Sequence, residues 1–148
     1  MKRSKVIKFI VFAFAFLYLY TAFSKLMVYD RSLQDLERSP FISQYAVPLS
    51  ILLPVLEIGI AVLLLIPKYR RLGLIASLGL MIAFTTYVTA MVFTLKELPC
   101  SCGGLIRELT WKQHFFFNIF VTLMAILGLY LHIRENRPHN RHLIIHYT

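Results

Sequence analysis

The chain has 148 residues, of which 58% are hydrophobic, and its mean hydropathy is +0.68. A water-soluble domain of this length is much more polar, so the composition excludes an ordinary soluble fold and indicates an integral membrane protein. The formal net charge is +9, but the basic residues lie between long apolar runs, where they set membrane orientation. We therefore expect the lipid bilayer, and not nucleic acid, to be the partner of this chain.

The first predicted element is a membrane-spanning helix over residues 6–24. This run matches the roughly 20 apolar residues that cross a bilayer core. A basic N-terminus precedes it, but the run is too long for a typical signal peptide and lacks a clear cleavage site, so we predict an uncleaved anchor. Lys25 follows the run, and we expect it to reach the outer headgroups while its stem stays buried.

The second predicted span covers residues 47–66 and contains Glu57, the only acidic residue inside a predicted span. A carboxylate in the bilayer is costly and points to function. In the third span, residues 72–95, Thr85 and Thr86 lie at a similar depth, so we predict a buried polar site formed with Glu57. This site is either a polar pocket that handles protons or an interhelical hydrogen bond that fixes packing. A solute transporter is less favoured, because no inverted repeat is evident.

Cys100 and Cys102 follow the third span and are separated by a single residue. Two cysteines are too few for a disulfide framework or a four-ligand zinc site. A disulfide that closes so short a loop adds little chain-entropy stabilisation, and strained, exposed disulfides tend to be catalytic. We favour a redox pair. A structural disulfide and a metal site that recruits His114 are the alternatives, and we assign no metal.

The fourth predicted span covers residues 115–133, and a basic tail over residues 134–148 follows it. His114 lies at the start of this span and is a possible proton donor or acceptor for the cysteines; the alternative is a histidine that merely lies at the interface. Together the four spans predict an all-α, integral membrane four-helix bundle that forms one domain over residues 1–148.

The distribution of basic residues predicts the orientation of these spans in the membrane. The two termini and the segment between spans two and three hold ten Lys and Arg residues, and the other two connections hold six. The positive-inside rule then places both termini in the cytoplasm. Cys100 and Cys102 are therefore predicted on the extracytoplasmic side of an inner or plasma membrane, where disulfides persist.

Four segments resemble the MauE/DoxX-type redox-associated membrane proteins: FSKL at residues 23–26, LPVLEI at 53–58, CSCGG at 100–104 and WKQHFFFN at 111–118. The resemblance implies a small four-helix membrane protein with a redox association. The family is linked to methylamine utilisation, and its namesake is thought to help mature or export a disulfide-rich dehydrogenase subunit. Family members often have Cys-Gly-Cys-Phe-Gly where this chain has Ser101 between the cysteines and Gly103 after them.

Two functions of different kinds fit these observations. In the first, Cys100 and Cys102 exchange thiol/disulfide electrons with an extracytoplasmic protein partner, and a quinone within the bundle is a possible electron carrier. In the second, the protein is a non-enzymatic scaffold or assembly subunit whose cysteines are structural or dispensable. Replacing both cysteines with serine distinguishes the two functions, because only a scaffold keeps working.

Overall fold

The computed structural model describes residues 3–94 and 111–145, and these residues are almost entirely helical. Four long helices are each long and apolar enough to cross a membrane, and they are α1 (Arg3–Met27), α3 (Ala46–Leu65), α4 (Arg70–Thr94) and α5 (Trp111–Ile145). The predicted all-α membrane bundle is thereby confirmed. Cys100 and Cys102 lie outside the described residues.

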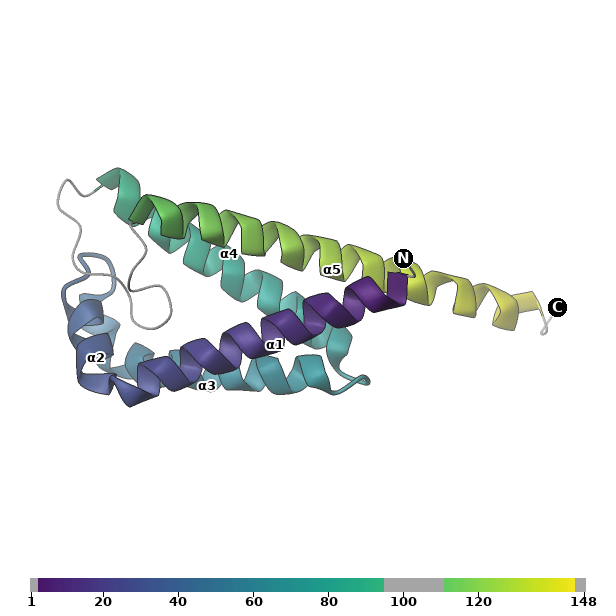
Figure 1. The fold of residues 1–148 in the computed structure, drawn as a ribbon, viewed down its shortest axis with the longest axis horizontal. Helices are drawn as coiled ribbons and strands as arrows, with labels where there is room; N and C mark the ends of the chain where they lie inside the picture. Colours follow the sequence, from purple (N-terminus) through teal and green to yellow (C-terminus); the bar gives the residue numbers. More distant parts are fainter. Residues whose placement is uncertain (1–2, 95–110, 146–148) are drawn as a thin grey trace.

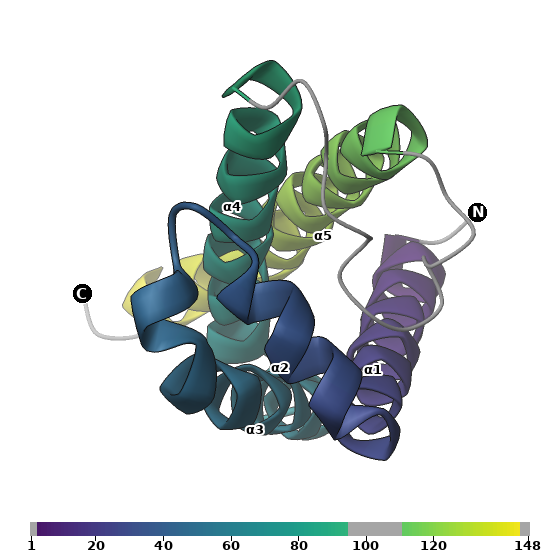
Figure 2. The same cartoon turned by 90° about the vertical axis from the view of Figure 1, so that its left-hand side faces the viewer.

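The four long helices form a closed ring around one core (Figure 2). α1 packs along α3 and α4 packs along α5, while contacts between α3 and α4 and between α1 and α5 complete the ring. The first and last described residues lie toward the same end of the bundle, and α2 lies at the opposite end (Figure 1). This arrangement agrees with an even number of membrane crossings.

Large apolar side chains occupy both the inside and the outside of the ring. Ile10, Leu64 and Leu74 are buried in the core, whereas Phe16 and Phe120 are more than 60% exposed. A soluble protein rarely exposes so many large apolar groups, and here they form the surface that faces lipid.

Two glycines allow neighbouring helices to come close. A Cβ atom on Gly73 would lie 2.8 Å from the backbone nitrogen of Leu64, where α3 turns into α4. A Cβ atom on Gly128 would lie 2.9 Å from Cγ2 of Ile10, where α5 crosses α1. Small residues at such points let membrane helices pack tightly without a hydrophobic driving force.

The structure also differs from the sequence-based expectation in two places. The connection between the first two spans contains a helix, α2 (Tyr29–Glu37), and a short 3-10 turn, η1 (Ser43–Tyr45). α2 is stabilised by packing on α3, and this contact buries Ser32 and Leu36 on one face of the helix.

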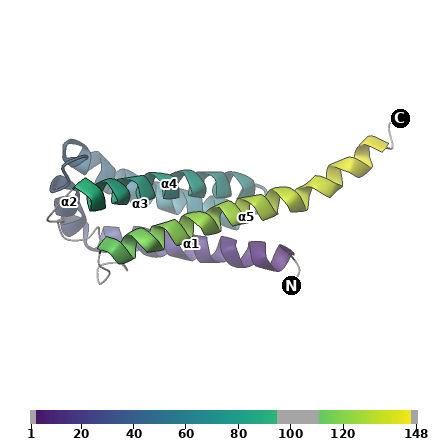
Figure 3. The ribbon, with the colours of Figure 1, turned by 90° about the horizontal axis from the view of Figure 1, so that it is seen from above.

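The second difference is at the C-terminus, where residues 134–148 were predicted to be a tail after the last span. Instead, α5 continues without interruption to Ile145 and extends beyond the bundle (Figure 3). The apolar run does end near residue 133, but a helix in water does not need apolar residues. Pro138 does not end it, because a proline removes one backbone hydrogen bond and more often kinks a long helix.

Candidate functional site

A buried ion pair joins α1 to α3 near the α2 end of the bundle. Lys25 Nζ lies 2.5 Å from Glu57 Oε1, and the two side chains are 17% and 1% exposed. Lys25 also lies 5.7 Å from the centre of the Phe84 ring, close enough for a cation–π contact. The expectation that Lys25 reaches the outer headgroups is therefore wrong: its ammonium group turns inward, because the carboxylate offers a stronger partner than interfacial water.

Proline and serine residues shape α3 next to this pair. Pro54 lies within α3, three residues before Glu57, and it lacks the N–H that would bond the Ser50 carbonyl. The Ser50 hydroxyl donates to the Val47 carbonyl at 2.7 Å and lies 3.1 Å from the Tyr29 hydroxyl oxygen. This local network ties the first half of α3 to the start of α2.

The ion pair lies in the wall of a cavity of about 300 Å³. All four long helices line this cavity, α2 contributes Ser32, Asp35 and Leu36, and most of the lining side chains are apolar. A largely apolar cavity with a few convergent polar groups is the usual form of a small-molecule site. The cavity is therefore the candidate functional site of the described residues.

Two polar atoms in the cavity wall have no hydrogen-bond partner within residues 3–94 and 111–145: Glu57 Oε2 and Asn118 Nδ2. Glu57 is 1% exposed and Asn118 is 5% exposed. Thr21 lies close to the Glu57 carboxylate, and its hydroxyl donates to the Tyr18 carbonyl at 3.1 Å. Buried polar atoms are nearly always paired, so an acceptor and a donor left over in one cavity point to a bound polar group.

His114 and Asn118 both line this cavity from α5, as expected for residues four apart on one helix. His114 is only 8% exposed, so its side chain packs inside the bundle. Glu57 and His114, which the sequence analysis singled out, therefore line one cavity together with Asn118.

Thr85 and Thr86 do not join Glu57. The Thr85 hydroxyl donates to the Met81 carbonyl at 2.7 Å and lies 3.0 Å from Thr122 Oγ1 on α5. Thr86 is exposed, and its hydroxyl donates to the Ile82 carbonyl. Neither threonine lines the cavity, so their shared depth with Glu57 did not predict a shared site.

Sequence reasoning also missed Tyr18 of the first span. Its ring is 1% exposed, and its hydroxyl lies 2.8 Å from Ser77 Oγ on α4. Tyr18 lines the same cavity. A tyrosine surrounded by phenylalanines carries no sequence signal that separates a buried hydroxyl from a lipid-facing ring.

The comparison with protein families supplies an independent observation. The family model of the methylamine utilisation protein MauE matches residues 3–131. The chain belongs to the MauE family. No curated protein and no solved structure matches it. Membership, together with the four apolar helices, makes this a multi-pass membrane protein associated with methylamine utilisation.

The segments that resemble MauE proteins converge on the cavity. Residues 23–26 supply Lys25, residues 53–58 supply Glu57, and residues 111–118 supply His114 and Asn118. The fourth segment, with both cysteines, joins the end of α4 to the start of α5, and these helix ends lie at the α2 end of the bundle (Figure 1). Three of the four MauE-like segments thus line the cavity, and the fourth connects helix ends at the same end of the bundle.

Proposed function

We propose that this MauE-family protein exchanges thiol/disulfide electrons with an extracytoplasmic protein partner through Cys100 and Cys102. The observation that supports this function best is the position of the candidate site. The cavity, with its buried Lys25–Glu57 pair, lies at the bundle end from which the cysteine-bearing connection departs. A redox pair at that end can meet a protein outside the membrane and a lipophilic electron carrier inside it.

The exchange is balanced as an ordinary dithiol–disulfide reaction. One cysteine attacks a partner disulfide as its thiolate and forms a mixed disulfide, and the leaving sulfur departs as a thiolate. The second cysteine then attacks the mixed disulfide, which releases the partner as a dithiol and leaves a Cys100–Cys102 disulfide. The reverse sequence oxidises the partner. His114 would accept or donate the thiol proton from the adjacent start of α5.

We propose a quinone as the carrier for this reaction and the cavity as its binding site. In the direction that oxidises the partner, a quinone bound there would take up two electrons and two protons from the Cys100/Cys102 dithiol, which would restore the disulfide and release a quinol. Asn118 Nδ2 would donate to a ring carbonyl of the quinone, and Glu57 Oε2 would accept from a ring hydroxyl of the reduced quinol. The apolar lining would hold the ring and exclude water.

Thiol labelling tests the exchange. In intact cells, a membrane-impermeant maleimide should label Cys100 and Cys102 only after reduction, and a C100S or C102S variant should trap the partner as a mixed disulfide. The C100S/C102S double variant should fold but fail in exchange. Full function in that double variant would assign the scaffold role instead. Labelling only after permeabilisation would overturn the proposed orientation.

Quinone binding is tested separately with a water-soluble short-chain ubiquinone and the purified protein. We expect Asn118→Leu to weaken binding about tenfold, which is the usual effect of losing one hydrogen bond of about 1.4 kcal/mol. Thr86→Val, on the exposed face of α4, is the matched control and should bind as the parent does. If Asn118→Leu binds the quinone as well as Thr86→Val and the parent do, the quinone does not bind in this cavity. That outcome would not affect the proposed thiol exchange.

A further inference from the structure

A second cavity lies at the opposite end of the bundle, away from the ion pair. Its volume is about 500 Å³, and it is lined by the start of α1, the turn from α3 to α4, the first residues of α4 and the last apolar turns of α5. The turn around Pro67 joins two membrane spans, so this cavity lies at the level of the lipid headgroups. It plays no part in the proposed thiol exchange.

The lining of this second cavity is strongly basic. Helix α1, the turn between α3 and α4, and the start of α4 contribute four cationic side chains: Lys8, Lys68, Arg70 and Arg71. Glu135 is the one carboxylate among the lining residues. Glu135 is exposed. It therefore offsets only part of the positive potential, and the field in the cavity favours an anion.

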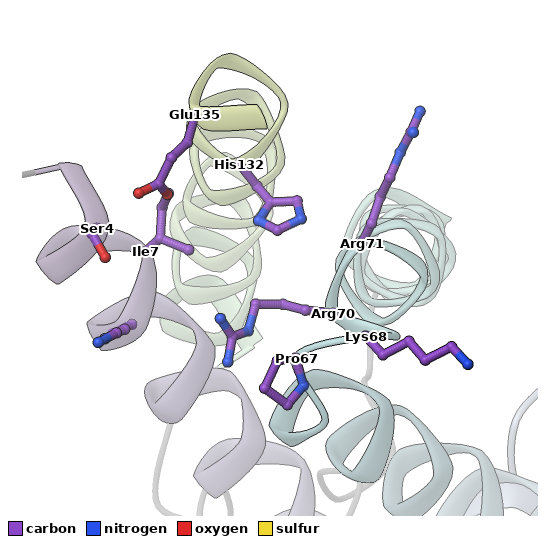
Figure 4. Close-up of a pocket in the computed structure, with 9 residues that line it drawn as sticks. Ser4, Ile7, Pro67, Lys68, Arg70, Arg71, His132 and Glu135 are labelled. Atoms are coloured by element: carbon purple, nitrogen blue, oxygen red, sulfur yellow. The ribbon is translucent and has the colours of Figure 1, made fainter. Parts of the chain in front are cut away.

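Arg70 distinguishes this cavity from an ordinary basic rim. Its side chain projects from the start of α4 toward α1, whereas Arg71 and Lys68 point outward (Figure 4). Arg70 is half-buried, and its Nε donates to the Leu64 carbonyl at 3.4 Å. That bond fixes the direction of the guanidinium group while using one of its five donors. His132 projects from α5 into the same region (Figure 4).

We propose that this cavity binds the phosphate of an anionic phospholipid headgroup. Arginine presents a planar fork that matches phosphate oxygens, and Lys8 adds a point charge from α1. The first turn of α4, which begins at Arg70, adds the positive end of a helix dipole. Basic pockets between membrane helices on the cytoplasmic side characteristically hold such headgroups, and the predicted orientation puts this end there.

A lipid fits this location better than soluble phosphate does. Lys8 and Arg71, which line the cavity, are exposed at the outer surface of the bundle. Phe9, which follows Lys8 on α1, is 70% exposed, so apolar surface on which an acyl chain would lie begins beside a lining cation. Both ligands share the phosphate chemistry, so the experiment must separate them.

The test measures phosphatidylglycerol binding to the purified full-length protein in detergent by native mass spectrometry, with phosphatidylcholine as the neutral comparison. We expect Arg70→Gln and Lys8→Gln each to weaken phosphatidylglycerol binding about tenfold, because each removes a charge-assisted contact. Arg70→Lys should fall between Arg70→Gln and the parent, because it keeps the charge but loses the fork.

Matched controls carry the same loss of charge outside the cavity. Lys5 and Arg134 are exposed and do not line it, so Lys5→Gln and Arg134→Gln should change binding less than twofold, well below the loss expected at a direct contact. If the control substitutions weaken phosphatidylglycerol binding as much as Lys8→Gln and Arg70→Gln do, the lipid is held by diffuse surface charge. That result would refute a specific site in this cavity. Displacement of the lipid by equimolar inorganic phosphate would refute the lipid assignment. Lys8→Gln keeps the test valid if Arg70→Gln misfolds, since Lys8 is exposed.

Discussion

At the scale of single residues, the buried pair of Lys25 and Glu57 has an asymmetric energetic role. Removing one partner strands the other charge away from water, whereas removing both leaves an apolar contact. The pair therefore adds little net stability, but it specifies how α1 packs on α3. The two helices must pack in the register that places Lys25 Nζ 2.5 Å from Glu57 Oε1.

A double-mutant cycle tests this role. Lys25→Met should destabilise the purified protein by about 3–5 kcal/mol, because it leaves the Glu57 carboxylate buried and unpaired. Lys25→Met combined with Glu57→Leu should recover most of that loss. The measurement is the midpoint of unfolding in detergent, with Lys5→Met as a control for the loss of an exposed lysine. Additive effects of the two substitutions would show that the pair does not interact.

The sequence predicted Glu57 as a functional residue and grouped it with Thr85 and Thr86, which do not line its cavity. Depth along a helix indicates which residues share a layer, but not which faces meet. The rotation of α4 turns Thr86 outward and Thr85 toward α5. The better signal was charge: Lys25 and Glu57 are opposite charges next to and within apolar runs, and a membrane charge is expected to have an oppositely charged partner.

At the scale of elements, the spans were predictable because length and apolarity alone decide whether a helix crosses a bilayer. α2 was not predictable in this way. Its stability comes from covering the end of the bundle, a surface that exists only after α1 and α3 have packed. The end of α5 was also missed, since the limit of an apolar run marks the edge of the membrane and not the end of a helix.

The turn from α3 to α4 gives a prediction within a single helix. Gly73→Ala should destabilise the protein by about 1–3 kcal/mol, because the new methyl group would meet backbone atoms that cannot move aside. Gly79→Ala, also on α4, has open space around it and should be neutral or stabilising by up to about 1 kcal/mol. Thermal unfolding of the two variants in one detergent makes the comparison. Equal effects would contradict the close approach at Gly73.

At the scale of the whole molecule, the ring of four long helices brings the first and last described residues toward the same side of the bundle (Figure 1). The charge distribution predicts that this side is the cytoplasm. The helix ends that flank the cysteines then lie on the other side, which is the arrangement that the proposed exchange requires. The fold determines that the helix ends flanking the cysteines lie opposite the chain ends (Figure 1). The positive-inside rule predicts which of these two sides is the cytoplasm.

Reporter fusions test the orientation. Green fluorescent protein fused after Thr148 should fluoresce, since it folds in the cytoplasm, and alkaline phosphatase fused there should be inactive. Alkaline phosphatase fused after Ile42, in the connection before α3, should be active. The reverse pattern would place the cysteines in the cytoplasm and would leave the thiol exchange without its oxidising compartment.

The ion pair between α1 and α3 also bears on how the chain enters the membrane during synthesis. Glu57 arrives at the insertion machinery inside an apolar helix, where an acidic residue near the centre costs about 2.5–3.5 kcal/mol. Lys25 has by then already been synthesised, at the end of α1. If α1 stays next to the insertion machinery, Lys25 can pair with Glu57 as α3 enters the membrane. Insertion of α3 would then depend on the presence of α1.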